Sequence, residues 1–130
     1  MRPFVLNGDV WRPVLVPDDD PRLMDRTGSS RLATTDPSTM CVYLSNGLKG
    51  LDLEVVLTHE VGHCALHSYG LLDSLHAIVP EDAWVDVEEW VCNYLANYGR
   101  EIIHAANTAL GCPVPVVRRQ AYDRPVCRRG

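Results

Sequence analysis

Two histidines and a glutamate in one short motif are the residues best suited to chemistry in this chain. The motif reads His59-Glu60-Val61-Gly62-His63, and the apolar run before it, residues 51–57, is typical of a helix. Residues four apart lie on one face of a helix, so His59 and His63 can direct two imidazoles at one metal ion. Glu60 lies about 100° further round, beside the ion, where a carboxylate can take a proton from water. The spacing predicts a zinc site with Glu60 as general base.

The alternative is that these are ordinary residues of a helix. The surrounding run is otherwise apolar, and burying three adjacent ionisable side chains in it is costly unless something satisfies them. A metal ion would do so, and we therefore favour the metal site.

Two histidines do not complete such a site, because a catalytic zinc usually has three protein ligands and a water. His67 lies eight residues beyond His59, about 12 Å along a helix, too far for both to bind one ion. A metzincin would need glycine and histidine where this chain has Leu66 and Tyr69. The third ligand must therefore come from another element.

A second helix, predicted over residues 81–98, offers that ligand. Its large apolar residues share one face: Trp84, Val87, Val91, Tyr94, Leu95 and Tyr98. A second row is mostly small and contains one acid: Val85, Glu89, Cys92 and Ala96. Small residues let two helices approach closely, so helical phase favours Glu89 over Glu88 as the ligand. A solvent-facing acid is the alternative for Glu89. We predict one Zn²⁺ per chain, bound by His59, His63 and Glu89.

These two segments together resemble the ImmA/IrrE family of metallopeptidases. The family pattern is HExGH followed, about 25 residues later, by ExxAN/DxFA, and residues 89–96 read EWVCNYLA. The chain departs from it at Cys92 and Leu95, and Gly99-Arg100-Glu101 replaces the usual Leu-Met-Pro segment. The resemblance implies a zinc-dependent endopeptidase of a phage or mobile element. It also implies a protein substrate, for which a helix-turn-helix transcriptional repressor is one candidate.

The predicted fold is α+β, a minimal zincin-like arrangement in which a small antiparallel sheet packs on the motif helix and the second helix. Residues 4–6 and 10–16 read as a hairpin around Asn7-Gly8, and residues 31–35 and 40–45 read as two further strands. The strand at 40–45 is a candidate edge for pairing with an extended substrate.

The motif helix is predicted over residues 53–68, with Asp52 as N-cap and Gly70 as its stop. A loop is expected over residues 71–79. Gly99 is expected to break or kink the second helix, and a third helix over residues 100–110 is expected to end at Gly111.

The length, charge and composition of the chain give the remaining predictions, on domains, partners, location and cysteines. The 130 residues suit a single domain, expected over residues 1–111, followed by a Pro- and Arg-rich tail over 112–130. The net charge is −5 although the tail is basic, so the body is acidic and is not expected to bind nucleic acid.

No apolar run is long enough to span a membrane and no secretory signal is evident, so we expect a cytoplasmic protein, in the host cytoplasm if the gene belongs to a phage. Five cysteines without CxxC spacing argue against disulfides, and Cys41, Cys64 and Cys92 are expected to be buried free thiols.

The predicted function is a zinc endopeptidase of narrow specificity acting on a protein or peptide. The alternative is a metal-containing binding or regulatory protein with little hydrolytic activity. The sequence does not select the residue that would stabilise an oxyanion, and five side chains remain open: His67, Tyr69, His76, Tyr94 and His104.

Overall fold

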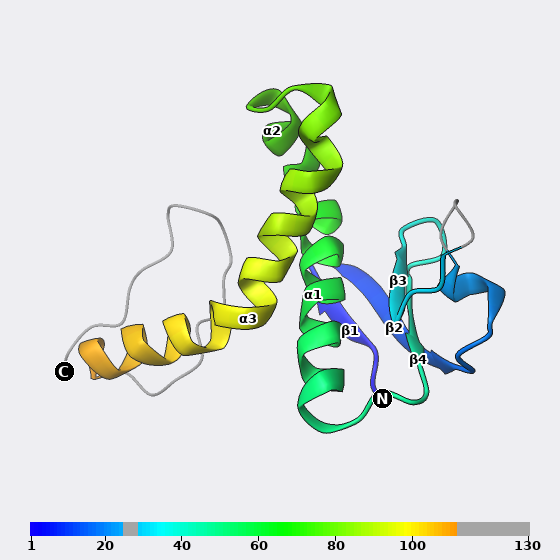
Figure 1. Cartoon of the computed structure of the whole chain (residues 1–130). Coiled ribbons are helices and arrows are strands. Elements are labelled where there is room, and N and C mark those ends of the chain that lie inside the picture. The colour runs from blue at the N-terminus through cyan, green and yellow to red at the C-terminus, as the bar shows by residue number, and fades with distance from the viewer. Residues whose placement is uncertain (25–28, 112–130) are drawn as a thin grey trace. The chain divides into compact units, whose positions relative to one another are not determined.

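The computed structural model describes residues 1–24 and 29–111, and their fold is α+β, as predicted. The described residues form four strands and three α-helices (Figure 1): β1 Phe4–Leu6, β2 Asp9–Val16, β3 Ala33–Asp36, β4 Cys41–Ser45, α1 Gly50–Ser68, α2 Leu71–Ala77 and α3 Trp84–Leu110. Short 3-10 turns lie at Pro21–Leu23 and Glu81–Ala83. The chain divides into two units after Asn97, within α3. The predicted tail, residues 112–130, lies outside the described residues.

The four strands form one sheet in the order β1-β2-β4-β3. The outer pairs are antiparallel, but β2 and β4 are parallel, so the prediction of an antiparallel sheet is wrong and the sheet is mixed. Parallel neighbours need a long crossover connection, and the segment between β2 and β4 supplies one. As a result β4 is an interior strand, and the prediction that residues 40–45 form an exposed edge is also wrong. The edge strand on that side is β3.

The first hairpin forms where the sequence predicts it. Asn7 and Gly8 both have positive φ, 49° and 84°, as a tight type I′ turn requires. Phe4 then pairs with Trp11 and Leu6 with Asp9. This register places the Trp11 side chain in the core.

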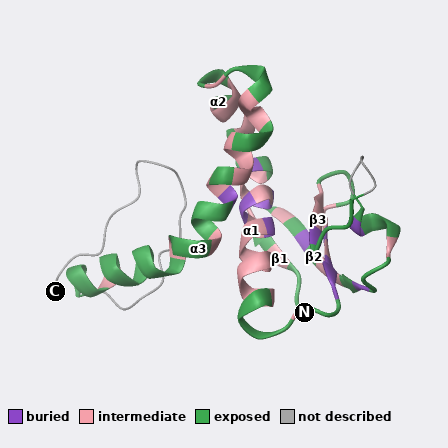
Figure 2. Ribbon diagram, in the orientation of Figure 1, coloured by how far each residue is buried: buried purple, intermediate pink, exposed green. Residues whose placement is uncertain are grey.

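The core lies between the sheet and α1. Its buried residues come from three strands and one helix (Figure 2): Trp11, Ala33, Val42, Leu44 and Cys64. Val42 and Leu44 alternate with less buried residues along β4, as expected for a strand with one face on the core. Leu53, Val56 and Leu57 of α1 pack against this cluster. Helix α1 is therefore fixed on the sheet by the turns just before the motif at residues 59–63.

Helix α1 begins three residues earlier than predicted. Its N-cap is Lys49, which makes no side-chain capping hydrogen bond, so the prediction of Asp52 as N-cap is wrong. Asp52 lies in the first turn, where a negative charge favours the helix dipole. Gly70 follows the helix with φ 65°, which confirms the predicted stop.

Two other helix predictions need correction. The expected loop after Gly70 contains the short helix α2, whose seven residues are too few for a clear periodic pattern. Gly99 does not end the second helix, because α3 runs from Trp84 to Leu110, so the prediction of a separate third helix over residues 100–110 is wrong. Glycine costs only about 1 kcal/mol relative to alanine inside a helix, and the flanking residues outweigh it. Gly111, with φ 67°, follows the end of α3 as predicted.

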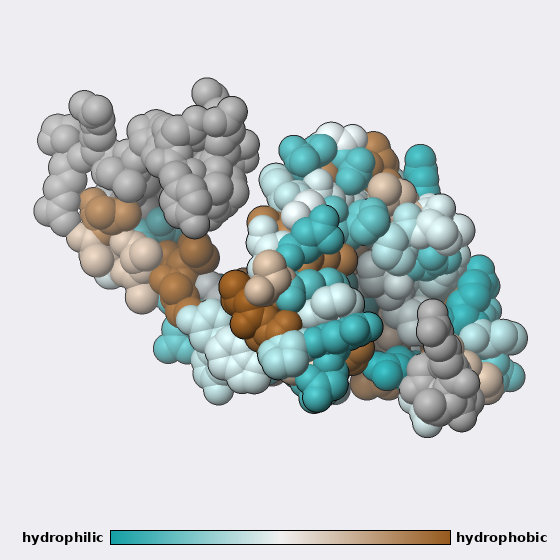
Figure 3. Space-filling view, turned by 90° about the horizontal axis from the view of Figure 1, so that it is seen from above, coloured by the Kyte–Doolittle hydropathy of each residue, from teal (hydrophilic) through white to brown (hydrophobic). Residues whose placement is uncertain are grey.

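Apolar side chains are also exposed outside the core. Hydrophobic and hydrophilic surface are interspersed in the view from above (Figure 3), and Ile78, Val85 and Trp90 are each more than 60% exposed, at 76%, 72% and 65%. Within the described residues, none of the helices has the length and apolar character needed to cross a membrane.

Candidate metal centre

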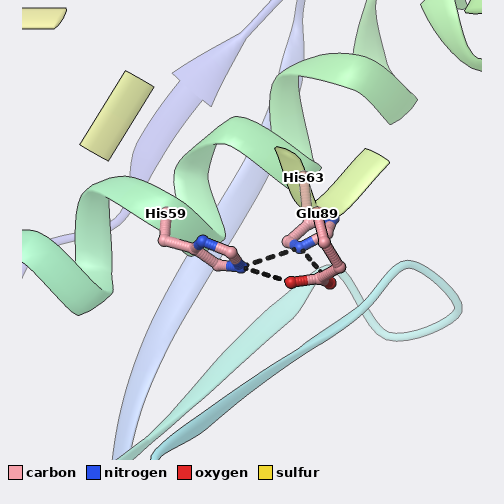
Figure 4. A group of neighbouring side chains, drawn as sticks. All are labelled: His59, His63 and Glu89. Atoms are coloured by element: carbon pink, nitrogen blue, oxygen red, sulfur yellow. Dashed lines mark hydrogen bonds and ion pairs between the residues drawn. The ribbon is translucent and has the colours of Figure 1, made fainter. Parts of the chain in front are cut away.

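The structure brings together the three predicted metal ligands. His59 and His63 project from successive turns of α1 toward Glu89 of α3 (Figure 4). The Nε2 atoms of the two histidines are 3.1 Å apart, and each lies 3.1 Å from one oxygen of the Glu89 carboxylate. Two imidazoles and one carboxylate thus converge on a single point, although the ligands come from segments about 30 residues apart in sequence.

The neighbouring acid, Glu88, contacts the other side of His63. Its Oε1 accepts a hydrogen bond from Nδ1 of His63, at 2.9 Å. With the proton on Nδ1, the Nε2 lone pair of His63 faces His59 and Glu89. A metal-binding histidine commonly has such a partner, which fixes both its tautomer and its ring orientation. Glu88 is therefore an orienting residue, a role that helical phase alone did not reveal.

The donor atoms suit a zinc ion. Zinc bonds of about 2.0–2.1 Å in a tetrahedral arrangement place adjacent donors about 3.3 Å apart, close to the 3.1 Å spacings here. Two neutral imidazoles and one carboxylate also match the ligand set of many catalytic zinc sites. Three protein donors leave the fourth coordination position of a tetrahedral ion open to a water or a substrate atom.

Close contact between α1 and α3 delivers Glu89 to the histidines. Gly62 and Cys92 are both buried, and a Cβ added at Gly62 would lie 3.2 Å from Cys92 Sγ and 3.5 Å from its Cα. A side chain at position 62 would be crowded by Cys92, so glycine suits this close approach. Cys92 lies one turn beyond Glu89, so the contact sets the position of the carboxylate.

Glu60, the predicted base, lies on α1 between the two ligands and is 7% exposed. Its Oε2 accepts a hydrogen bond from the Thr35 hydroxyl of β3. The same hydroxyl lies 3.4 Å from the Glu60 backbone oxygen. A buried carboxylate needs such a donor, and this one comes from the edge strand. Thr35 therefore links the orientation of the base to the sheet.

A cavity of about 420 Å³ opens onto these residues. One wall is the face of α1 that carries His59, Glu60 and His63, and Glu88 and Glu89 of α3 also line it. Residues of β3 and its ends line the rest, together with side chains from flanking segments: Met24, Arg31, Ala33, Thr34, Thr35, Pro37, His67 and Leu72. His59, His63 and Glu89, the Glu60 carboxylate and the edge strand β3 therefore line the same cavity.

Of the five side chains left open as oxyanion donors, only His67 lines this cavity. His76 stacks on Trp84, with ring centroids 4.2 Å apart, and Tyr94 stacks on Trp90. Tyr69 is the C-cap of α1. His104 belongs to α3 beyond Asn97.

Two buried thiols lie behind the site. Cys64 and Cys92 are free and fully buried, as predicted. Cys41 is also free, but it is partly exposed, so the prediction that it is buried is wrong. Burial raises the pKa of the Cys64 thiol to about 12, and the nearby Glu60 charge adds to the effect. Burial likewise raises the pKa of Cys92 to about 12, with Glu89 and Glu88 contributing. Both thiols stay protonated at neutral pH, and neither belongs to the cluster of His59, His63 and Glu89.

A scan against models of known protein families finds no match for this chain, and a search of curated proteins also finds none. The case for a function therefore comes from the residues of the site and their arrangement.

Proposed function

We propose that the protein is a zinc-dependent peptidase whose metal is held by His59, His63 and Glu89. The observation that carries the proposal is the buried Glu60 carboxylate, which lines the same cavity as these three donors. A purely structural metal site has no use for a base beside the ion.

A zinc ion held there supplies Lewis acidity toward water and toward a peptide carbonyl. Glu60 accepts a proton from the attacking water as the water oxygen bonds to the carbonyl carbon. Glu60 then delivers that proton to the departing amine nitrogen when the C–N bond breaks. The Thr35 hydroxyl holds the Glu60 carboxylate in place through these transfers. Glu88 keeps Nδ1 of His63 occupied, so that Nε2 remains a ligand.

The edge strand β3 offers a way to bind an extended peptide. Ser45 N–H donates to the Leu32 carbonyl at 2.9 Å, and this pairing continues the β3–β4 register. Opposite residues in an antiparallel ladder alternate between hydrogen-bonded and non-bonded pairs. The backbone groups of Ala33 and Thr35 therefore point away from β4, toward an edge with no further strand among the described residues. Both residues line the cavity, so a peptide paired there would pass the metal donors.

The proposed substrate is a protein segment that can become extended. The resemblance to ImmA/IrrE metallopeptidases favours a helix-turn-helix repressor, in the cytoplasm of a cell that carries a phage or mobile element. The alternative, a zinc-containing binding protein without hydrolysis, differs from the peptidase in one respect: it does not need the Glu60 carboxylate.

The test compares wild-type protein with Glu60→Gln, both loaded with zinc, on a mixture of unfolded proteins and peptides. General-base catalysis contributes about 10²–10⁴-fold, so cleavage by Glu60→Gln should fall by that factor. Glutamine can still accept the Thr35 hydrogen bond, so zinc content and melting temperature should stay unchanged. Glu54→Gln, on the same helix but outside the cavity lining, is the matched control and should cleave like wild type.

Mass spectrometry of the products identifies the cleaved bonds. Equal cleavage by wild type and Glu60→Gln would mean that a contaminating protease is responsible. A wild-type protein that binds zinc but cleaves nothing, including candidate repressors, would favour the binding protein.

A further inference from the structure

His67 occupies the proposed active-site cavity one helical turn beyond His63. His59, His63 and His67 are spaced by four residues along α1 and all three line the cavity. His67 is nevertheless not part of the donor cluster, which consists of His59, His63 and Glu89. Its imidazole is therefore a polar group in the cavity that the metal centre does not use.

The ring of His67 has a fixed support. It meets the indole of Trp11 edge-on, with ring centroids 5.9 Å apart and an interplanar angle of 89°. Trp11 is fully buried, and its Nε1 donates to Ser68 Oγ at 2.8 Å. Asn7 Nδ2 donates to the Ser68 carbonyl, also at 2.8 Å. The β1–β2 hairpin thus fixes the position of Trp11, against which the His67 ring packs.

The ring nitrogens of His67 are available to a ligand. Across residues 1–24 and 29–111 they make no hydrogen bond, and the side chain is exposed. This differs from His63, whose two nitrogens contact Glu88, Glu89 and His59. An imidazole that lines a cavity, and whose nitrogens make no hydrogen bond to the described residues, can donate to a bound substrate.

The charges around the proposed reacting centre favour an additional donor. Three carboxylates, Glu60, Glu88 and Glu89, line the cavity together with one cationic side chain, Arg31. The carboxylates oppose the negative charge that a carbonyl oxygen acquires when water adds to it, so a hydrogen-bond donor beside the zinc ion would help to stabilise that oxygen. A preorganised donor aimed at that oxygen is a large term in peptide hydrolysis.

We propose that His67 is a catalytic residue that donates an N–H hydrogen bond to the oxygen of the scissile carbonyl. The proposal rests on the proposed peptidase function. When the water oxygen bonds to the carbonyl carbon, the C=O electron pair moves to this oxygen, and Glu60 takes the water proton. When the C–N bond breaks, the electron pair returns to re-form C=O, and the Glu60 proton goes to the amine. His67 keeps its proton throughout.

The test replaces His67 with phenylalanine, which keeps a ring against Trp11 and removes both nitrogens. Removal of one oxyanion donor lowers kcat about 10²–10³-fold, so His67→Phe should show this loss with an unchanged KM. His67→Gln restores a donor and should recover part of the rate. His104→Phe, a histidine that does not line the cavity, is the matched control and should resemble wild type.

A binding measurement supplies a second readout. A peptide phosphonate carries the tetrahedral, negatively charged oxygen of the transition state. Calorimetry should show that His67→Phe weakens phosphonate binding at least tenfold. In a Glu60→Gln background, binding of the uncleaved peptide should not change, because only the transition state carries the charge.

The outcomes separate this proposal from the one on which it rests. If wild type cleaves peptides, and His67→Phe matches it in kcat and phosphonate affinity, His67 only packs on Trp11 and the inference is overturned. Loss of zinc, or a large fall in melting temperature, in both His67 variants would also overturn it. If wild type neither cleaves peptides nor binds the phosphonate, the peptidase function itself fails, and the role of His67 falls with it.

Discussion

At the scale of single residues, two adjacent acids of α3 have different relations to the same histidine. Glu89 faces Nε2 of His59 and of His63, each at 3.1 Å, whereas Glu88 faces Nδ1 of His63 at 2.9 Å. Neighbours on a helix point about 100° apart, so two consecutive acids can reach opposite sides of one imidazole. In the proposed metal site, Glu89 is therefore the ligand and Glu88 orients His63.

Substitution of each acid should therefore weaken metal binding to a different degree. Glu89→Ala removes a donor and should abolish stoichiometric zinc binding. Glu88→Ala leaves three donors but frees the His63 ring, and loss of such a partner typically lowers metal affinity about 10–100-fold. Competition titration with a zinc-binding dye measures both variants. Wild-type affinity in Glu88→Ala would show that the His63 contact has no orienting role.

The base has its own supporting residue in Thr35. Thr35→Val keeps the shape of the side chain and removes the hydroxyl that donates to Glu60 Oε2. A hydrogen bond to a charged group contributes about 1.5–3 kcal/mol, so kcat should fall roughly 10- to 100-fold while zinc affinity stays constant. Thr35→Ser retains the hydroxyl and serves as the control. A valine variant as active as the serine variant would show that Glu60 does not depend on this bond.

At the scale of elements, the crossing of α1 and α3 decides whether a complete donor set exists. Gly62→Ala would place a methyl group 3.2 Å from Cys92 Sγ, closer than ordinary packing allows. Overpacking of this kind costs about 1–3 kcal/mol and would push Glu89 away from the histidines. We expect a lower melting temperature and at least tenfold weaker zinc binding.

A second substitution checks that interpretation. Cys92→Ala removes the sulfur and leaves the 3.5 Å contacts with Cα and Cβ, which are ordinary packing. Combined with Gly62→Ala, it should restore much of the zinc affinity, and a double-mutant cycle measures the coupling. If the effects of the two substitutions on zinc affinity are additive, the contact between Gly62 and Cys92 does not set the position of Glu89.

The same elements mark what the sequence could and could not predict. Helix α1 and the row with Glu89 and Cys92 followed from side-chain periodicity, because helical phase is a local property. The mixed sheet could not be predicted from periodicity, because the direction of β4 relative to β2 depends on the connection between these two strands and not on either strand's own sequence. Continuation of α3 through Gly99 was missed because one glycine is a weak local signal. Thr35 was missed as a partner of Glu60 because a contact between residues 25 apart has no local signature.

At the scale of the whole molecule, the site joins α1, α3 and the edge of the sheet, so an ion there should stabilise the fold. A ligand that binds only the folded state at a free concentration of 100 times its Kd adds about 2.7 kcal/mol. For a domain of this size, removal of zinc should lower the melting temperature by about 10 °C. Calorimetry of the protein with and without chelator measures the shift, and Glu89→Ala should show none. An equal shift in that variant would mean that zinc stabilises the chain from another site.

The central claim is that one zinc ion is bound by two imidazoles and one carboxylate from α1 and α3. X-ray absorption spectroscopy of the zinc-loaded protein, together with its metal content, tests this claim most directly. We predict one zinc per chain, four nitrogen or oxygen neighbours at about 2.0–2.1 Å, no sulfur, and the multiple-scattering signal of two imidazoles. A protein that retains no zinc, a sulfur neighbour at about 2.3 Å, or one imidazole would contradict the claim.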